Sequence, residues 1–385
     1  MDSSAMTEYP LSFWERDSFL HYDFIVVGGG IIGLSTAISL RTSAPNASIL
    51  LLERGIFPSG ASTKNAGFAC FGSLTEILSD CQRIGEDATL DIIEKRWKGL
   101  EILRNRLGDK SINYQQHGGY ELLFDEQKDA VDKIDYANAM LHRLFEKDVF
   151  SVRNSLIRQF GFNENNVHSL ILNPFEGQIH SGMMMKSLIR YATELGIEIL
   201  TGINVQEIID EGNYCSLRSS HSSGDITFRA GKTAVCTNAF IPVLLPEYSI
   251  KPGRGQVLIT TPIDSLKFKG VFHFDEGFYY FRNVNNRVLF GGGRNMDFAG
   301  EESGELSTSH LIQHRLEELL HSVILPGTPF QIEHRWAGIM GFSSSKLPIV
   351  QKSSPNIAVG FGCNGMGVAL GSETGRETAE LLVSS

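Results

Sequence analysis

The hydrophobic pattern near the start of the chain predicts a strand, a turn, a helix and a second strand. An apolar run over residues 24–27 ends in three glycines, and a largely apolar stretch with small polar residues follows over 31–40. After a polar loop, a second apolar run over 49–52 ends at Glu53. Short apolar runs bounded by turn residues are typical of buried strands, and the longer run between them fits a buried helix.

Later segments separate into helical and extended patterns. Four of them place apolar residues at three- and four-residue steps, which predicts helices; they are residues 74–108, 126–160, 181–195 and 307–324. Others are short apolar or alternating runs between turn residues, which predicts strands; they are residues 120–124, 254–263, 270–274, 277–283, 287–293 and 330–342, with a hairpin over 213–237. Residues 356–383 read as strand, glycine turn and helix.

This order predicts two domains of mixed class, α/β combined with α+β. A Rossmann-like βαβ unit opens the chain and a strand–glycine–helix unit closes it, so both ends are expected to build one domain. A mostly antiparallel sheet, inserted between them, builds the other. The expected boundaries are 1–112, 168–248 and 334–385 for the dinucleotide-binding domain, and 113–167 and 249–333 for the substrate domain.

The first glycine cluster has the spacing of a dinucleotide-binding fingerprint. Gly28, Gly30 and Gly33 occupy the three glycine positions of G-x-G-x-x-G. They allow a tight turn, close approach of a pyrophosphate and close packing of the helix on the sheet. Glu53 lies twenty positions past Gly33 (53 − 33), where a carboxylate accepts a hydrogen bond from a ribose 2′-hydroxyl. An acid at this position disfavours NADP.

Composition excludes several classes of function. At 385 residues, two packed domains are expected. A net charge of −10 gives no electrostatic basis for binding nucleic acid. The five cysteines are scattered without a C-x-x-C pair, which argues against zinc and disulfides and favours a reducing, cytoplasmic location. The longest uncharged run, residues 24–40, carries four glycines and is therefore not expected to span a membrane.

Four further segments resemble motifs of one enzyme superfamily. They are GASTKNAG (60–67), GINVQEI (202–208), HRWAGIMGFSSSKLPIV (334–350) and GCNGMGVALGSETGRETAELL (362–382). In this order, nearly the whole chain resembles the FAD-dependent D-amino-acid oxidase superfamily, in its glycine oxidase and sarcosine oxidase-like, amine-oxidising branch. The closing segment favours FAD over NAD, because in that superfamily it faces the pyrimidine end of the flavin.

The resemblance implies a cofactor, a reaction and a set of binding residues. The expected cofactor is noncovalent FAD, because the segment that carries covalent flavin in sarcosine oxidases, Gly338 to Phe342, holds no cysteine. The expected reaction is hydride removal from a carbon next to an amine nitrogen, followed by hydrolysis of the imine. The residues expected to bind FAD are Gly28, Gly30, Ile31, Ile32, Gly33, Glu53, Arg54, Ser62, Thr63, Lys64, Asn65, Ala66, Gly67, Val205, Thr237, Asn238, Gly338, Gly365, Met366, Gly367 and Val368.

Three positions depart from the superfamily's pattern. Met340 stands where glycine-oxidising relatives carry a carboxylate-binding arginine, and Ala369 where sarcosine oxidases carry a lysine. The oxygen-activating lysine of sarcosine oxidases would fall near Leu289. Met340 by itself suggests a neutral or amine-bearing substrate end. Arg282 and Arg254 are the candidate replacement cations, with a structural contact favoured for Arg254.

The expected substrate site combines Tyr280, Arg282, Gln256 and Met340. Tyr279 and Tyr280 alternate faces along their strand, so only one of them is expected to reach the site. The histidines His117, His180 and His273 are expected to be structural, with a helix-start contact possible for His180, and no spacing predicts a metal.

The partners expected are a small-molecule substrate and, as electron acceptor, oxygen or an electron carrier. Three alternatives stay open: a 2-hydroxy-acid dehydrogenase on the same fold, with His180 or His117 as base; a NAD-dependent dehydrogenase; and a flavin-binding scaffold without turnover. The sequence leaves the substrate, the acceptor and the oligomeric state undecided.

Overall fold

The computed structural model describes residues 9–384, whose contacts divide the chain into two compact units. Unit 1 comprises residues 1–63, 184–252 and 340–385, and unit 2 comprises 64–183 and 253–339. Residues 64–112, 168–183 and 334–339 were expected in the dinucleotide-binding domain but make their contacts within unit 2, and residues 249–252, expected in the substrate domain, belong to unit 1.

Unit 1 is built on a sheet with the strand order β17-β18-β11-β1-β2-β8, in which β18, β11, β1, β2 and β8 are parallel and β17 is antiparallel. The antiparallel strands β9 and β10 extend this sheet from β11. Its elements are α1 (Phe13–Phe19), β1 (His21–Val27), α2 (Ile31–Ser43), β2 (Ile49–Glu53), β8 (Glu198–Thr201), β9 (Val205–Asp210), β10 (Cys215–His221), β11 (Gly224–Val235), η2 (Asn238–Val243), β17 (Ile349–Ser354), β18 (Ile357–Phe361) and α11 (Gly367–Val383).

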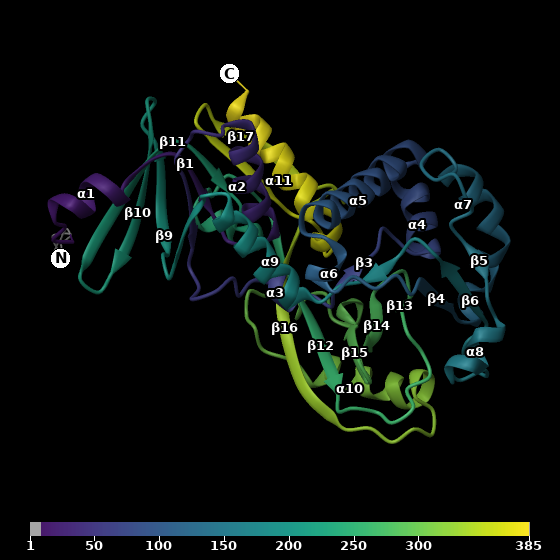
Figure 1. The fold of residues 1–385 in the computed structure, drawn as a ribbon. Coiled ribbons are helices and arrows are strands. Elements are labelled where there is room, and N and C mark those ends of the chain that lie inside the picture. Colours follow the sequence, from purple (N-terminus) through teal and green to yellow (C-terminus); the bar gives the residue numbers. More distant parts are fainter. Residues whose placement is uncertain (1–8, 385) are drawn as a thin grey trace. The chain divides into compact units, whose positions relative to one another are not determined.

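The βαβ prediction for the start of the chain is confirmed. β1 and β2 pair in parallel, and α2 connects them. The first ten residues of α2 are all buried, since the helix packs on the sheet and also beside α11 (Figure 1). Small residues permit that second contact: a Cβ on Gly375 of α11 would lie 2.6 Å from the Cβ of Ser35 of α2. The two ends of the chain therefore fold together through a close helix–helix contact.

Unit 2 is built on a mixed sheet with the order β16-β12-β15-β14-β13-β4-β6-β5. In it β13 and β4 pair in parallel, and antiparallel pairs form between β12 and β15, β15 and β14, β14 and β13, β4 and β6, and β6 and β5. Its elements are β3 (Phe68–Ala69), α4 (Leu74–Ile84), α5 (Glu86–Leu107), α6 (Asp109–Ile112), β4 (Gly119–Leu123), η1 (Asp125–Lys133), α7 (Ile134–Leu141), β5 (Ser151–Val152), α8 (Ser155–Phe160), β6 (Ser169–Asn173), β7 (Gly177–Gln178), β13 (Val271–Phe274), β14 (Tyr279–Val284), β15 (Arg287–Gly292), η3 (Arg294–Met296), α10 (His310–Leu319) and η4 (Leu320–Ile324). Four elements contain a boundary between the units: α3 (Ala61–Lys64), α9 (Ser181–Glu194), β12 (Lys251–Thr260) and β16 (Ile332–Phe342).

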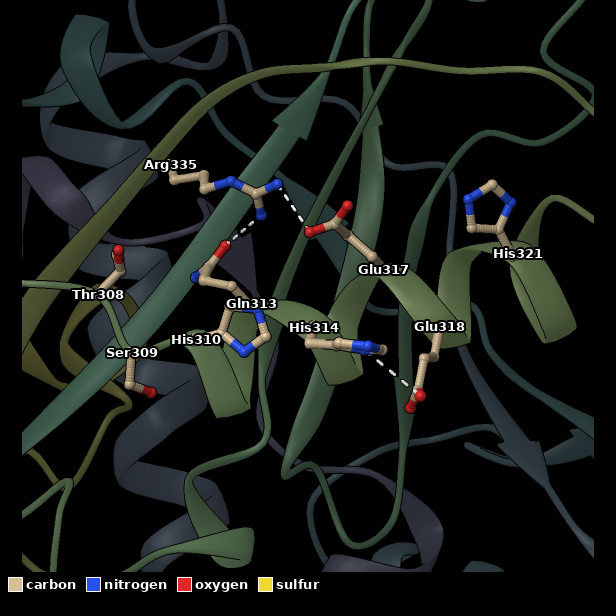
Figure 2. Close-up of a pocket in the computed structure, with 9 residues that line it drawn as sticks. All are labelled: Thr308, Ser309, His310, Gln313, His314, Glu317, Glu318, His321 and Arg335. Carbon is tan, nitrogen blue, oxygen red and sulfur yellow. Dashed lines mark hydrogen bonds and ion pairs between the residues drawn. The ribbon is translucent and has the colours of Figure 1, made fainter.

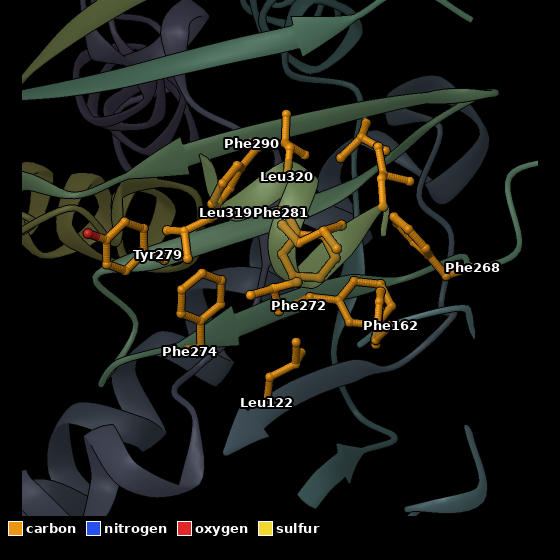
Figure 3. Close-up of a cluster of buried hydrophobic side chains, with 14 of the residues drawn as sticks. Leu122, Phe162, Phe268, Phe272, Phe274, Tyr279, Phe281, Phe290, Leu319 and Leu320 are labelled. Carbon is orange, nitrogen blue, oxygen red and sulfur yellow. The ribbon is translucent and has the colours of Figure 1, made fainter. Parts of the chain in front are cut away.

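One face of the unit 2 sheet carries an aromatic core (Figure 3). Phe272 and Phe281 stack with ring centroids 4.6 Å apart, and Phe274 stacks on Tyr279 at 4.8 Å. Apolar side chains of α10 and η4, such as Leu316 and Leu320, close this core from outside. The register alternates, so the other face of the same strands is left for different side chains.

Two of the predicted helices differ from the structure. The helix predicted over 74–108 is divided into α4 and α5 by Gly85, whose φ of +88° interrupts the helical path. The helix predicted over 126–160 is interrupted in the structure, because α7 ends at Leu141 and a loop with β5 separates it from α8, which covers Ser155–Phe160. The Asn138 side chain accepts hydrogen bonds from the amides of Val149 and Phe150, which fixes the following loop.

None of the helices in residues 9–384 combines the length and the apolar character that crossing a membrane requires.

We predict that Gly375→Ala lowers the free energy of unfolding by about 1–3 kcal/mol, the usual cost of forcing an extra carbon into a packed contact. The new methyl group would lie 2.7 Å from the carbonyl oxygen of Ile32. Gly367→Ala in the same helix is the control, because its Cβ would meet Cys363 at 4.0 Å, an ordinary contact. Urea unfolding of both variants measures the difference, and equal midpoints would contradict the close packing of α2 on α11.

Candidate functional site

The turn between β1 and α2 in unit 1 accepts only glycine at two positions. Gly28 has a φ of +106°, and a Cβ there would lie 2.7 Å from the carbonyl oxygen of Cys236. A Cβ on Gly33 would lie 1.8 Å from the carbonyl oxygen of Gly28. Gly30 is the N-cap of α2 and provides no side-chain hydrogen bond to the helix. The first turn of α2 is thus brought close to the end of β1, as a phosphate-binding turn requires.

Glu53, the last residue of β2, lies buried beside this turn. Its Oε2 accepts a hydrogen bond of 2.8 Å from the amide of Gly29, and its Oε1 one of 2.9 Å from the amide of Gly55. Each carboxylate oxygen has a second lone pair, so the same side chain can also accept hydrogen bonds from two ribose hydroxyls. Ser62 contributes from the next loop, where its Oγ accepts from the amide of Ile31 at 3.0 Å.

A second helix begins at the same edge of the sheet. β18, β11 and β1 are parallel neighbours, and α11 follows β18 as α2 follows β1. Gly362, just after β18, donates its amide to Oδ1 of Asn238 at 3.2 Å. Gly365 has a φ of +87°, and Met366 caps α11 without a side-chain hydrogen bond. Two helix N-termini therefore face the carboxyl edge of the sheet, where α/β folds bind their ligands.

These features fit an anionic dinucleotide. The hydroxyl oxygen of Thr237, buried next to the Gly28 turn, has no hydrogen-bond partner among residues 9–384. Burial raises the pKa of both Cys236 and Cys363 to about 12, so neither thiol places a negative charge near the two helices. A glycine cradle, two positive helix ends, a buried acid and a hydroxyl without a partner among residues 9–384 fit the requirements of FAD binding.

Unit 1 contains most of the residues expected to bind FAD. They are Gly28, Gly30, Ile31, Ile32, Gly33, Glu53, Arg54, Ser62, Thr63, Val205, Thr237, Asn238, Gly365, Met366, Gly367 and Val368. Arg54 lies over the ring of Phe240 at 4.2 Å, and the hydroxyl of Thr63 donates to the carbonyl oxygen of Pro58. Met340 also belongs to unit 1, with its sulfur 3.5 Å from the position that a Cβ on Gly365 would take.

The remaining expected FAD residues, Lys64, Asn65, Ala66, Gly67 and Gly338, belong to unit 2. Asn65 organises the loop through its Oδ1, which accepts from the amide of Gly67 at 2.9 Å and from Oγ of Ser181 at 2.8 Å. The indole of Trp336 donates to the carbonyl oxygen of Lys64 at 2.9 Å. These bonds fix the backbone of residues 64–67.

Tyr280 and Arg282 lie on one face of the unit 2 sheet, two residues apart on β14. Tyr279 lies on the opposite face, in the aromatic core, so the predicted alternation of the two tyrosines is confirmed. Burial raises the pKa of Tyr280 to about 12, which keeps its hydroxyl protonated and able to donate a hydrogen bond at neutral pH.

Arg282 is a buried cation that no carboxylate within residues 9–384 neutralises. Its side chain is among the buried ones, with a residue exposure of 7%, and its Nε has no hydrogen-bond partner in the described part of the chain. Burial alone lowers its pKa to about 10, and no carboxylate offsets that effect. The other buried arginines of unit 2 differ, since Arg96 pairs with Glu76 and Arg254 with Glu301.

The assignment of Gln256 to the substrate site needs correction. Val257 pairs with Gly291, which pairs with Tyr280, so Gln256 points to the face opposite Tyr280. There its amide nitrogen donates to Oε1 of Glu301 at 2.8 Å and to Oγ of Ser309 at 3.0 Å. Gln256 therefore has a structural role, in which it binds Glu301 and Ser309 on the face opposite Tyr280. The structural role favoured for Arg254 is confirmed by its bidentate pair with Glu301.

A hollow of about 570 Å³ lies beside α10 (Figure 2). Its lining is formed by Thr308, Ser309, His310, Gln313, His314, Glu317, Glu318, His321 and Arg335. Arg335 donates to Gln313 at 2.7 Å and to Glu317 at 2.8 Å, so its charge is already neutralised. Because α10 covers the aromatic core, this hollow lies on the face opposite Tyr280 and Arg282. It is a poor candidate for binding an anionic substrate.

The histidines take mainly structural positions. His180 accepts a hydrogen bond of 3.2 Å from the amide of Met183 at the start of α9, which confirms the helix-start contact. Burial, with a smaller contribution from Lys269, lowers the pKa of His117. No group of three or more His, Cys, Asp or Glu side chains with metal-binding geometry occurs within residues 9–384.

A buried polar cluster next to Tyr280 was not predicted from the sequence. It comprises Glu121, Glu176 and His273, with Glu76 and Arg96 beside them. Glu121 and Glu176 lie far apart from His273 in the chain, and only the pairing of β4 with β13 and the turn before β7 bring them together. A lone acid in an apolar strand, such as Glu121 in YELLF, was the one available indication.

We predict that Gly33→Ala weakens FAD binding by at least about tenfold, because any Cβ there collides with the backbone of the phosphate-binding turn. Gly60→Ala is the matched control, since a Cβ at Gly60 meets nothing within 4 Å and should leave FAD affinity unchanged. Titration of the FAD-free protein with FAD, followed by flavin fluorescence, measures both. Normal affinity in the Gly33 variant would contradict this placement of the dinucleotide.

Comparison with known proteins shows the family of this chain. "Probable oxidoreductase OrdL" of Haemophilus influenzae is 22% identical over 94% of this chain and 83% of its own length. Glycine oxidase of Bacillus subtilis is 21% identical over 94% of each chain. The solved structure of L-proline dehydrogenase from P. horikoshii shares the fold, with a TM-score of 0.76, 16% identity and 94% of each chain covered. The family described as FAD dependent oxidoreductase matches residues 23–381, and this chain belongs to it.

Proposed function

We propose that this FAD-dependent oxidoreductase oxidises the C–N bond of a small amino-acid-like amine whose anionic end binds to Arg282. The observation that carries the proposal is the buried guanidinium of Arg282, which no anion neutralises among the described residues. A buried charge without a partner is costly, and a substrate carboxylate would remove that cost. Bidentate pairing between arginine and carboxylate also fixes the orientation of the ligand.

Tyr280 supports the same assignment. It lies two residues from Arg282 on the same face, and its protonated hydroxyl can donate a second hydrogen bond to an anionic group. The apolar residues around it, Ala66, Val257 and Leu289, exclude water from this face, which strengthens any pairing with a charge. Bound FAD supplies the two-electron acceptor, so the substrate loses a hydride from the carbon next to its nitrogen and the resulting imine is hydrolysed by water.

The names of the relatives are compatible with this substrate class. Glycine oxidase, "4-methylaminobutanoate oxidase (formaldehyde-forming)" and "Sarcosine oxidase subunit beta" are named for compounds that combine an amine with a carboxylate. This chain lacks an arginine at Met340, and Arg282 offers the cation from a different strand. The carboxylate would therefore be bound from the sheet of unit 2.

We predict that amines carrying a carboxylate bleach the flavin absorbance under anaerobic conditions, and that the matched amines without a carboxylate do not. Sarcosine against N-methylethylamine and proline against pyrrolidine are suitable pairs, with 2-hydroxy acids as a third class. Readmitted air then shows whether oxygen reoxidises the flavin. Reduction by hydroxy acids alone would establish the dehydrogenase alternative, and a flavin that no compound reduces would favour the scaffold alternative.

Arg282→Gln should raise the dissociation constant of a reactive amino acid by about 10- to 100-fold, the value of a hydrogen-bonded pair with a charged partner. Arg335→Gln is the control, because Arg335 is already paired with Glu317 on the opposite face. Stopped-flow reduction at several substrate concentrations separates the dissociation constant from the limiting rate. Unchanged binding in the Arg282 variant would refute the proposed carboxylate contact.

The same contact predicts a pH dependence. Arg282 is protonated below its pKa of about 10 and loses its charge as the pH rises through that value. Binding of a carboxylate ligand should therefore be constant from pH 7 to pH 9 and weaken about fourfold by pH 10.5, from the fraction deprotonated. The Arg282→Gln variant should show no such loss. Equal loss in both proteins would assign the effect to another group.

A further inference from the structure

The buried cluster beside Tyr280 contains two acids and one histidine, Glu121, Glu176 and His273, which we call the acid–histidine cluster. Residue exposures are 3%, 1% and 8%, respectively. His273 on β13 and Glu121 on β4 are paired in register, and Glu176 lies in the turn before β7. None of the three has a part in the proposed contact with substrate.

Both acids bind the segment that follows the FAD-binding loop. Oε1 of Glu176 accepts from the amides of Phe71 at 3.1 Å and Gly72 at 3.3 Å. Glu121 accepts from the hydroxyl of Ser73 at 3.0 Å and from the amide and hydroxyl of Thr75. The acids therefore fix the backbone of residues 71–75. Burial raises the pKa of Glu121, whereas the buried charge of Glu176 must be compensated by a nearby cation.

His273 is the group that can compensate Glu176. Its Nε2 lies 3.6 Å from Oε2 of Glu176 and has no hydrogen-bond partner within residues 9–384. The nearby cation Arg96 is already engaged, since it donates to the carbonyl oxygen of Phe71 and to Glu76. A buried carboxylate facing an imidazole in this geometry favours the imidazolium form.

The acidic groups around His273 all raise the pKa of this histidine. Burial lowers the pKa of His273, but the close approach of Glu176, with the charges of Glu121 and Glu76, outweighs burial and leaves that pKa raised. The other titratable neighbours are neutral or already paired. Burial raises the pKa of Cys70, Tyr114 and Tyr280, which keeps these three groups protonated, and Arg96 pairs with Glu76.

One short segment connects this cluster to the proposed substrate residues. A Cβ on Gly67 would lie 3.1 Å from Nη2 of Arg282. The next residue, Phe68, contacts the rings of both His273 and Tyr280, with centroids 5.1 and 5.7 Å apart. His273 and Tyr280 are also cross-strand partners. Residues 67–72 therefore run from Arg282, past Tyr280 and His273, to Glu176.

We propose that His273, as an imidazolium paired with Glu176, is a positioning residue that holds residues 67–72 against Tyr280 and so shapes the anion site at Arg282. The proposal rests on the proposed function of Tyr280 and Arg282. A histidine whose pKa is raised in the folded state stabilises the structure fully below the unfolded value, and this stabilisation is lost as the pH rises through the folded value. Residues 67–72 should accordingly loosen at alkaline pH.

Hydrogen–deuterium exchange of the FAD-loaded protein tests this role without a substrate. In the wild type, protection of the amides of residues 68–72 should fall at least tenfold between pH 6 and pH 9, after correction for intrinsic exchange. In His273→Gln, protection should be low at both pH values. In Glu176→Gln, which keeps an acceptor oxygen but no charge, protection should no longer depend on pH. His168→Gln, an exposed histidine facing Asp125 on the same unit, is the control and should match the wild type.

Binding of a carboxylate ligand provides the second readout. At pH 6.5, His273→Gln should raise the dissociation constant of the ligand at least fivefold, and His168→Gln should not change it. Wild-type protection that does not vary with pH, or wild-type protection and affinity in His273→Gln, would overturn the proposal. If His273→Gln does not fold, the wild-type pH series and Glu176→Gln decide the question.

The two proposals fail in different ways. If Arg282→Gln binds carboxylates as the wild type does, the proposed function fails, whatever the exchange results. If Arg282→Gln loses affinity while residues 68–72 exchange identically in all variants and at all pH values, the substrate site stands and the positioning role of His273 falls.

Discussion

The close contact between α2 and α11 is the constraint on which the expected FAD site depends. The two helices follow parallel strands of one sheet, so their N-termini lie at the same edge, and side-by-side packing brings these N-termini close together. Gly375 permits this approach, because a larger residue would collide with Ser35 and Ile32. The contact joins segments more than three hundred residues apart, and it places two positive helix ends where an anionic cofactor needs them.

The two faces of the unit 2 sheet carry different kinds of side chains. One face carries the stacked rings of the aromatic core, among them Phe272 and Phe281, and provides stability through burial (Figure 3). The opposite face carries Tyr280, Arg282 and His273 among apolar neighbours. Polar groups in such surroundings are costly unless they are paired, so an unpartnered Arg282 is informative, whereas the paired Arg254 and Arg335 are not.

The buried acids Glu176 and Glu121 support the backbone of residues 71–75, which follow the loop of residues 64–67. Glu176 and Glu121 use their oxygens for backbone amides and hydroxyls of residues 71–75, and the charge of Glu176 has to be balanced within the same protein interior. Arg96 and His273 are the cations in reach. A segment held by such a network keeps a defined geometry only while the charges of the network are balanced. Histidine is the group of this network whose protonation changes most readily near neutral pH.

Local pattern was sufficient to predict the parts of this protein that depend on neighbouring residues. The glycine turn, Glu53 at the end of β2, the α9 helix and the alternation of Tyr279 and Tyr280 follow from spacing alone, because strand and helix periods are set by the backbone. The end of α7 and the face on which Gln256 lies could not be predicted, since they depend on Asn138 binding a distant loop and on strand register. Tertiary structure alone decided that no carboxylate of the described residues 9–384 neutralises Arg282 and that Glu176 lies next to His273, because both depend on which strands become neighbours.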